Sequence, residues 1–161
     1  KHKFPMLSIQ NESDLISFDK AIRKKIVDSS EIEYVVELKI DGLSVNLNYV
    51  NGMLKSAATR GDGEFGEDIL ENVKTIKDIP RQLKKNELNS SLLWDIEVRG
   101  ELYLSTIDFD IINEEQTKLG KRQFSNPRNL AAGIVKLKDS SLVAKRPLKC
   151  FAYSILSVEG D

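Results

Sequence analysis

The sequence predicts an α+β fold in which helices flank a largely antiparallel sheet. Several short stretches alternate between apolar and polar residues and are separated by turn signals, as in strands joined by hairpins. Other stretches carry apolar residues at helical spacing behind capping residues. The two kinds of stretch follow one another in mixed order, which favours an α+β architecture.

The first predicted helix covers residues 13–26, with Asn11 or Ser13 as its cap. A strand is predicted over residues 33–40, because apolar residues occupy every second position there. The other side of this strand would carry Glu37, Lys39 and Asp41. One of its faces is therefore available for solvent or for chemistry.

The pattern breaks at Asp41-Gly42. Beyond this dipeptide the apolar residues change phase, and a continuous strand would carry them to the wrong face. We therefore expect a turn, a bulge or a break there. Asn51-Gly52 then predicts a two-residue hairpin turn, followed by a strand over residues 53–60 and a loop over 61–66.

The second half of the chain repeats these signals. Ser105 and Asp108 resemble a capping box, and Asn126-Pro127 places a cap before a proline in the first helical turn. The predicted elements are a helix over 68–76, a polar connection over 84–91, a strand over 93–104, helices over 105–119 and 126–136, and a strand over 148–156.

Composition limits the classes of function. The 161 residues suit one domain with a real core, and no apolar run is long enough to cross a membrane. Lys and Arg total 24 against 25 Asp and Glu, a net charge of −1, whereas a dedicated DNA clamp is normally basic. The single Cys150 excludes an internal disulfide and fits a packed, inert thiol in a reducing compartment. The chain alone is a poor candidate for tight DNA binding, but a positive pocket for one nucleotide stays open.

Lys39, followed by Asp41-Gly42, is the first candidate for chemistry. A lysine is a covalent nucleophile only when its amine is neutral, which requires burial or cationic neighbours. Asp41 could hold this amine or a ribose hydroxyl, and the glycine allows a backbone or substrate to approach closely. The alternative is a solvated lysine before an ordinary Asp-Gly turn.

Three further segments carry charges next to glycine or to a helix start. Arg60 ends a strand before a glycine-rich loop, so it could face a phosphate or be a surface arginine. Glu97-Val98-Arg99-Gly100-Glu101 could be an exposed, ion-paired face or the polar wall of a pocket, and its glycine indicates close approach of a ligand or backbone. Arg128 lies in a first helical turn, where the helix dipole disfavours a cation. Its side chain could therefore mark a binding site for an anion, or it could simply extend into solvent.

Together these segments resemble the nucleotidyltransferase (adenylation) domain of bacterial-type NAD⁺-dependent DNA ligases. The matching stretches follow the family order along nearly the whole chain. They are Pro5-Met6-Leu7-Ser8, Glu37-Leu38-Lys39-Ile40-Asp41-Gly42-Leu43, Ala58-Thr59-Arg60-Gly61-Asp62-Gly63, Gly66-Glu67-Asp68, Glu71-Asn72-Val73, Thr75-Ile76, Ile79-Pro80, Glu97-Val98-Arg99-Gly100-Glu101, Asn126-Pro127-Arg128-Asn129 and Phe151-Ala152-Tyr153.

The resemblance implies roles around the predicted nucleophile. Lys39 would take AMP from NAD⁺ as a lysyl-AMP phosphoramidate and release nicotinamide mononucleotide, and Asp41 would orient it. Glu37 would read the adenine, and Ser8 and Ile9 would line the nucleotide pocket.

Four more residues receive implied roles in binding the cofactor. Arg60 and Glu101 would hold the ribose region, and Arg128 would serve the phosphate side. Lys136 stands where the family usually has an arginine, so it keeps the charge but loses the bidentate fork.

The resemblance also implies Mg²⁺, nicked duplex DNA as a partner, roles in DNA replication and repair, no membrane, a monomer and a cytoplasmic location. Residues 1–30 would form an N-terminal segment and helix of the adenylation domain, and 31–161 its core, truncated at the C-terminal side. Two later lysine motifs, the N-terminal region that grips nicotinamide mononucleotide and the DNA-binding modules would lie outside the chain, so we expect the chain alone to be inactive.

Two alternatives remain open at this point. Because Lys-x-Asp-Gly is shared with ATP-dependent ligases and mRNA capping enzymes, the domain could be a covalent nucleotidyltransferase that uses ATP or GTP. It could also be a non-catalytic adenosine-binding fragment.

Overall fold

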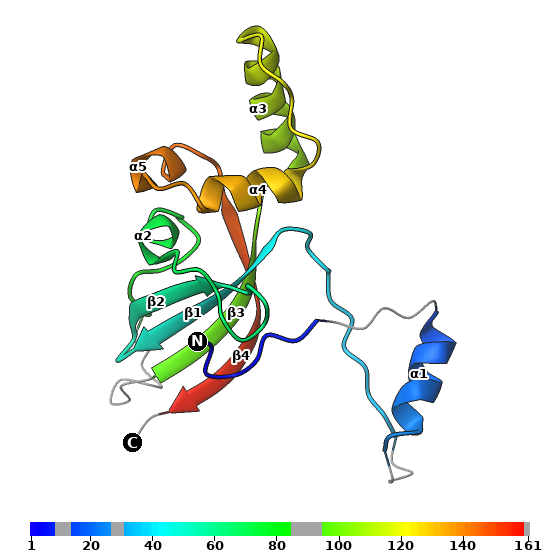
Figure 1. Ribbon diagram of the computed structural model, residues 1–161. Coiled ribbons are helices and arrows are strands. Elements are labelled where there is room, and N and C mark those ends of the chain that lie inside the picture. The colour runs from blue at the N-terminus through cyan, green and yellow to red at the C-terminus, as the bar shows by residue number, and fades with distance from the viewer. Residues whose placement is uncertain (9–13, 27–30, 85–94, 160–161) are drawn as a thin grey trace. The chain divides into compact units, whose positions relative to one another are not determined.

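The computed structural model describes residues 1–8, 14–26, 31–84 and 95–159 (Figure 1). The chain divides into two compact units. The larger unit comprises Lys1–Pro5 and Ile40–Asp161, and the smaller unit comprises Met6–Lys39. In the described part of the chain, no helix is both long and apolar enough to cross a membrane.

The larger unit contains one four-stranded antiparallel sheet, as the alternation predicts. Its strands are β1 (Leu43–Val50), β2 (Met53–Thr59), β3 (Asp95–Tyr103) and β4 (Lys149–Glu159), in the order β2-β1-β3-β4. Asn51 and Gly52 join β1 to β2 with φ values of 51° and 72°, which confirms the predicted hairpin turn.

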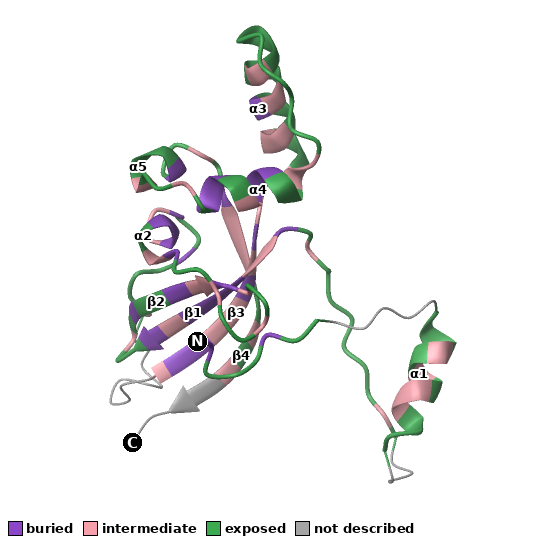
Figure 2. Ribbon diagram, in the orientation of Figure 1, coloured by how far each residue is buried: buried purple, intermediate pink, exposed green. Residues whose placement is uncertain are grey.

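Helices supply the apolar cover for this sheet. They are α2 (Leu70–Val73), α3 (Thr106–Lys118), α4 (Pro127–Val135) and α5 (Ser140–Val143). Helix α4 contacts β1 and β3, α2 contacts β2 and α5, and α3 packs on α4. Figure 2 shows the buried residues concentrated on the strands and on α2 and α4. The core joins Val45, Leu47 and Tyr49 of β1 to Val73, Leu130, Ile134 and Val135 of the helices.

The alternate residues of β1 and β3 form a polar face. In the register of these strands Ser44 lies opposite Glu101, Asn46 opposite Arg99, and Asn48 opposite Glu97. The N-terminal segment Lys1–Pro5 lies on this face, because Arg99 Nη2 donates to the carbonyl oxygens of Phe4 and Pro5 at 2.9 Å each. We call this surface the polar sheet face.

Local signals predict the helix starts and the close approach of strands. The side chain of Ser105 caps α3 by accepting from the Asp108 amide, and that of Asn126 caps α4 by accepting from the Asn129 amide. At Gly100 an added Cβ would lie 2.9 Å from the Phe151 carbonyl oxygen. The close approach predicted there is therefore to the backbone of β4.

The predicted strand over 33–40 is wrong. This segment has no regular secondary structure, and Val36 and Leu38 are 91% and 76% exposed. Alternation makes a strand only where a neighbouring strand accepts its backbone hydrogen bonds, and none of the described strands pairs with it. The predicted break at Asp41-Gly42 is confirmed, because Gly42 is a bend and β1 begins at Leu43.

Several boundaries also differ from the prediction. Helix α1 (Leu15–Arg23) is capped by Asp14, which accepts from the Ser17 amide, rather than by Asn11 or Ser13. The helix predicted over 68–76 is limited to α2, and α5 was not predicted. Residues 85–94, which include most of the predicted polar connection, lie outside the described residues.

Two glycines give a matched test of the packing. An added Cβ at Gly42 would overlap the Leu102 carbonyl, whereas at Gly133 in α4 it would meet nothing within 4 Å. We expect Gly42→Ala to lower the free energy of unfolding by about 2–4 kcal/mol. Gly133→Ala should raise it by about 0.5–1 kcal/mol, because alanine restricts the unfolded chain and favours the helix. Urea unfolding of both variants measures these changes. Equal changes in the free energy of unfolding would contradict the close contact between Gly42 and the Leu102 carbonyl of β3.

Candidate functional site

The predicted nucleophile lies in the smaller unit. Lys39 and Glu37 are exposed and belong to a segment without regular secondary structure, which the structure describes from residue 31 onward. The sequence predicts that a strand fixes the direction of the Lys39 side chain. This is wrong, because the segment is not a strand. Ser8 is exposed, and Ile9 lies outside the described residues.

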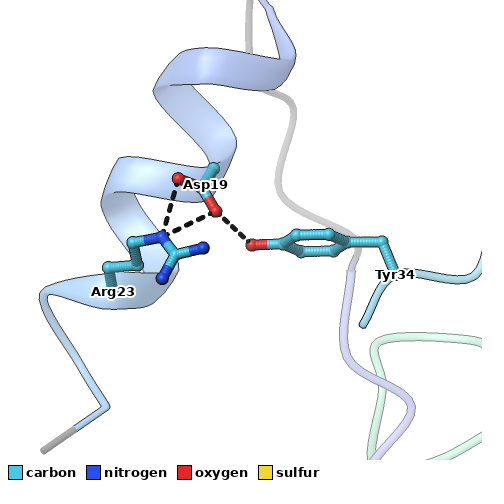
Figure 3. A network of polar contacts seen from close by, with 3 residues as sticks. All are labelled: Asp19, Arg23 and Tyr34. Carbon is cyan, nitrogen blue, oxygen red and sulfur yellow. Dashed lines mark hydrogen bonds and ion pairs between the residues drawn. The ribbon is translucent and has the colours of Figure 1, made fainter. Parts of the chain in front are cut away.

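A polar network ties this segment to α1 (Figure 3). The Tyr34 hydroxyl donates to Asp19 Oδ1 at 2.7 Å, and Arg23 Nε donates to both Asp19 oxygens at 3.0 and 2.9 Å. The hydrogen bond from Arg23, and then that from Tyr34, holds the pKa of Asp19 below its usual range. The ring of Tyr34 also lies 6.0 Å from that of Phe18. Tyr34, five residues before Lys39, thus holds this segment to α1.

Arg60 begins a tightly turned loop at the end of β2. The amide of Arg60 donates to the Ser44 carbonyl at 3.2 Å, and its carbonyl accepts from Gly63 N at 3.0 Å. Asp62 Oδ1 accepts from the amides of Phe65 and Glu64 at 2.7 and 2.9 Å, and these two bonds lower the pKa of Asp62. Gly61 and Gly63 have φ values of 58° and 103°, so the predicted open loop depends on glycine.

Ser44 brings Arg60 close to Glu101. While its carbonyl accepts from Arg60, its hydroxyl donates to Glu101 Oε2 at 2.8 Å. Tyr153 lies in the same electrostatic environment: burial and then the charge of Glu101 raise its pKa, whereas a hydrogen bond with Ser44 and then the charges of Arg99 and Arg60 lower it. Two residues predicted for the ribose region therefore share one neighbourhood on the polar sheet face. Sequence reasoning missed Ser44, although its polar position in the alternation of β1 was the available signal.

The first carboxylate of the Glu97–Glu101 segment is buried. Glu97 is 2% exposed and accepts from Asn46 Nδ2 through Oε1 at 3.0 Å. Its Oε2 and the Oδ1 of Asn46 have no hydrogen-bond partner among the described residues. The alternative of an exposed, ion-paired face is therefore wrong for Glu97, whose side chain is buried against Asn46.

Asp41 and Arg128 are brought together within the larger unit. Arg128 Nη1 lies 3.3 Å from Asp41 Oδ1, and the two side chains are 56% and 74% exposed. The predicted role of Asp41 was to orient Lys39, but its carboxylate here faces the cation at the start of α4. An exposed pair of this kind contributes only about 0–1 kcal/mol.

Lys136 lies at the other end of α4. Its amine pairs with Glu67, and both side chains are about half exposed. These two residues line a surface hollow of about 420 Å³ beside α2. The buried amide of Asn72 donates to the carbonyls on either side of Lys136, at 2.6 Å to Val135 and 2.7 Å to Leu137.

We expect Asn72→Ala to lower the free energy of unfolding by about 2–3 kcal/mol, because it removes both donors from buried carbonyls at a helix end. Asn72→Asp should cost more, since a carboxylate would face two carbonyl oxygens. Urea unfolding measures both effects. Lys74→Ala, which removes an exposed pair with Glu71, is the control and should stay within about 0.5 kcal/mol. If Asn72→Ala lowered the free energy of unfolding no more than Lys74→Ala does, the stabilising role of the two Asn72 hydrogen bonds would be contradicted.

The lowered pKa of Asp62 predicts that the free energy of unfolding decreases as the pH becomes acidic. A depressed carboxyl pKa contributes stability that is present above the unfolded value of about 3.9 and is lost as the pH falls through the folded pKa. Wild type should therefore be more stable than Asp62→Asn above about pH 4. Urea midpoints of both proteins from pH 6 downward should converge at the acid end, and a constant difference would contradict this account.

The described residues do not fit a metal site built from protein ligands alone. No three His, Cys, Asp or Glu side chains among them gather closely enough to hold a metal ion. Mg²⁺ is commonly held by one or two carboxylates together with substrate phosphates and water.

The fold and site define a class: an α+β domain whose sheet has one apolar face under helices and one polar face bearing Arg60, Ser44 and Glu101. The family model for the NAD-dependent DNA ligase adenylation domain matches residues 1–161, and the chain belongs to this family.

Curated relatives agree with this assignment. The chain is 47% identical over 162 residues to a DNA ligase of Thermotoga neapolitana, covering 99% of the chain and 22% of that protein. It is 46% identical over 164 residues to a DNA ligase of Bdellovibrio bacteriovorus, covering 100% and 23%. A DNA ligase of Cytophaga hutchinsonii is 44% identical over 158 residues, covering 96% and 23%. The chain thus spans less than a quarter of the length of these relatives.

Proposed function

We propose that this domain carries out the first chemical step of an NAD⁺-dependent DNA ligase, with Lys39 as the nucleophile. The amine of Lys39 would lose its proton and attack the adenylyl phosphorus of NAD⁺. A phosphorus–nitrogen bond forms as the bond to the phosphate oxygen of nicotinamide mononucleotide breaks, and this leaving group takes the electron pair. The observation that carries the proposal is the family match over residues 1–161, which includes the Lys39-Ile40-Asp41-Gly42 motif.

The polar sheet face supports a role in binding the nucleoside. The backbone amide of Arg60 and the carboxylate of Glu101 both bond to Ser44, and the charges of both side chains act on Tyr153. A donor-rich cation and an acceptor would therefore be available to ribose hydroxyls, which need both. Glu37 is assigned to the adenine, and Ser8 and Ile9 to the pocket wall, by their places in the family motifs.

The two exposed ion pairs support a role in binding phosphate. Arg128 with Asp41 and Lys136 with Glu67 place two cations at the two ends of α4. Exposed pairs are weak, so breaking them for a phosphate costs little. The cations would serve the phosphate side, with Arg128 able to bind in a bidentate manner and Lys136 acting as a point charge.

The whole protein would use this step to seal nicks in duplex DNA during replication and repair, as a cytoplasmic monomer with Mg²⁺. A net charge of −1 gives the chain itself no excess of cations to follow DNA phosphates. DNA contacts would therefore come from elsewhere in the protein. The family assignment favours NAD⁺ over ATP or GTP as the donor.

We expect Lys39→Ala to abolish covalent attachment of AMP in the full-length protein. Lys39→Arg should fail too, because a guanidinium stays protonated and cannot attack. Incubation with NAD⁺ labelled in its AMP half, followed by measurement of protein-bound label, tests this. Lys55→Ala is the matched control, since Lys55 is an exposed lysine of β2.

Three outcomes would contradict the proposal. Label retained at the wild-type level in Lys39→Ala would remove Lys39 as the nucleophile. Wild-type labelling from ATP or GTP but not from NAD⁺ would favour the alternative class of nucleotidyltransferase. Binding of adenosine without any covalent label from the three donors would favour a non-catalytic module.

A further inference from the structure

His2 is a buried residue at the start of the chain and the single histidine of the sequence. It is 8% exposed and lies 58 positions before Arg60. Its amide donates to the Glu64 carbonyl at 2.8 Å, and its ring Nε2 lies 3.2 Å from the Arg60 carbonyl oxygen. One residue thus contacts both the beginning and the middle of the loop that Arg60 opens.

The loop also packs against the His2 ring where it ends. An added Cβ at Gly66 would overlap the Thr59 carbonyl and lie 3.0 Å from His2 Nε2. Within the loop, Gly63 N donates to Arg60 O and Asp62 caps two amides, and these local bonds fix the shape of the turn. The turn is held to the sheet at two backbone groups of Arg60: its amide donates to the Ser44 carbonyl of β1, and its carbonyl contacts His2.

Two buried side chains of the polar sheet face hold the other side of the ring. Asn46 Nδ2 lies 3.5 Å from His2 Nδ1 and donates to Glu97 Oε1 at 3.0 Å. Asn46 and Glu97 are each 2% exposed. Because a carboxylate only accepts, the NH₂ of Asn46 is directed to Glu97, and its second hydrogen is directed to His2 Nδ1.

This order of donors and acceptors selects one form of the ring. His2 Nδ1 accepts from Asn46, and Nε2–H donates to the carbonyl of Arg60, which is the neutral Nε2–H tautomer. A proton on Nδ1 would face the Asn46 NH₂. Turning that amide would place its oxygen against the Glu97 carboxylate, so the NH₂ of Asn46 is the group that faces Nδ1.

The segment after His2 is anchored separately. Arg99 Nη2 donates to the carbonyls of Phe4 and Pro5 at 2.9 Å each. Arg99 lies on β3 two residues from Glu97, so the N-terminal segment is held by β3 directly after Lys3 and, before Lys3, through His2 and Asn46. The position of His2 on the sheet is therefore fixed, and its contact with the Arg60 carbonyl fixes the loop at that point.

We propose that His2 is a positioning residue for nucleotide binding: the Glu97–Asn46–His2 network fixes the carbonyl of Arg60, and through it the direction in which Arg60 meets the nucleotide. The inference rests on the function proposed above for Arg60. It assigns roles to a buried carboxylate, an amide and a histidine that touch neither the substrate nor the reacting atoms.

The structural part of the proposal is tested without any activity. Nitrogen-15 NMR of the histidine ring in the 161-residue chain should show the Nε2–H tautomer at neutral pH. His2→Phe keeps a ring of similar volume but removes both nitrogens, and it should speed hydrogen exchange at the Gly63 amide about tenfold. His2→Gln retains a donor and an acceptor and should restore most of the protection. The Nδ1–H tautomer, or unchanged exchange in His2→Phe, would overturn the network.

The functional part is tested in the full-length protein by kinetics of AMP transfer. His2→Phe should raise the KM for NAD⁺ about tenfold with a smaller change in kcat, and His2→Gln should recover most of it. If His2 acts through Arg60, the double variant His2→Phe/Arg60→Ala should be no weaker than Arg60→Ala alone. Additive losses would overturn the positioning role.

Two controls separate this role from general loss of stability and from the proposed function. Ile112→Val weakens the core between α3 and α4, away from the loop, and should leave the KM unchanged. A KM raised equally by Ile112→Val would show that the effect of His2→Phe is only structural. Wild type that takes no label from NAD⁺ would refute the proposed function, while the tautomer and exchange measurements would still decide the role of His2 in the loop.

Discussion

The pairing of β1 with β3 is the interaction on which the larger unit depends. β1 lies between β2 and β3, so its backbone groups are hydrogen-bonded on both sides. Its strict alternation then sends Val45, Leu47 and Tyr49 into the core and leaves Ser44, Asn46 and Asn48 on the polar sheet face. A shift of one residue in this register would bury the polar set and expose the apolar one. The same register that forms the core therefore also builds the candidate site.

The polar sheet face is unusual in how deeply it buries polar groups. Asn46 and Glu97 are each 2% exposed, and each has one oxygen without a partner among the described residues. Burial of polar groups is costly where bonds are missing, and the N-terminal segment supplies part of the bonding: His2 lies against Asn46 Nδ2, and the carbonyls of Phe4 and Pro5 accept from Arg99. The segment Lys1–Pro5 is thus part of the sheet's structure, although it is remote from β1 and β3 in the sequence.

Local signals allowed the hairpin and the helix caps to be predicted from the sequence. Ser105 and Asn126 act through bonds to residues three positions on, and Asn51-Gly52 acts through positive φ values, so neighbours in the chain contain the needed information. The strand over 33–40 could not be judged in this way, since a strand needs a partner that local alternation does not reveal. In the site, the motifs pointed to Arg60 and Glu101, but the bonds made by Ser44 and His2 depend on register and on a separation of 58 residues.

The placement of charge explains how a chain of net charge −1 could still bind an anionic ligand. Arg128 and Lys136 each have a carboxylate neighbour, Asp41 and Glu67. A cation left alone in a concave site would raise the potential there and attract any anion. A cation with an exposed carboxylate partner is held in place, yet it can exchange that partner for a phosphate at small cost. In the proposed function, the two carboxylates would be exchangeable partners: they would reduce nonspecific attraction to polyanions, while a ligand that offers phosphate with the correct geometry would displace them.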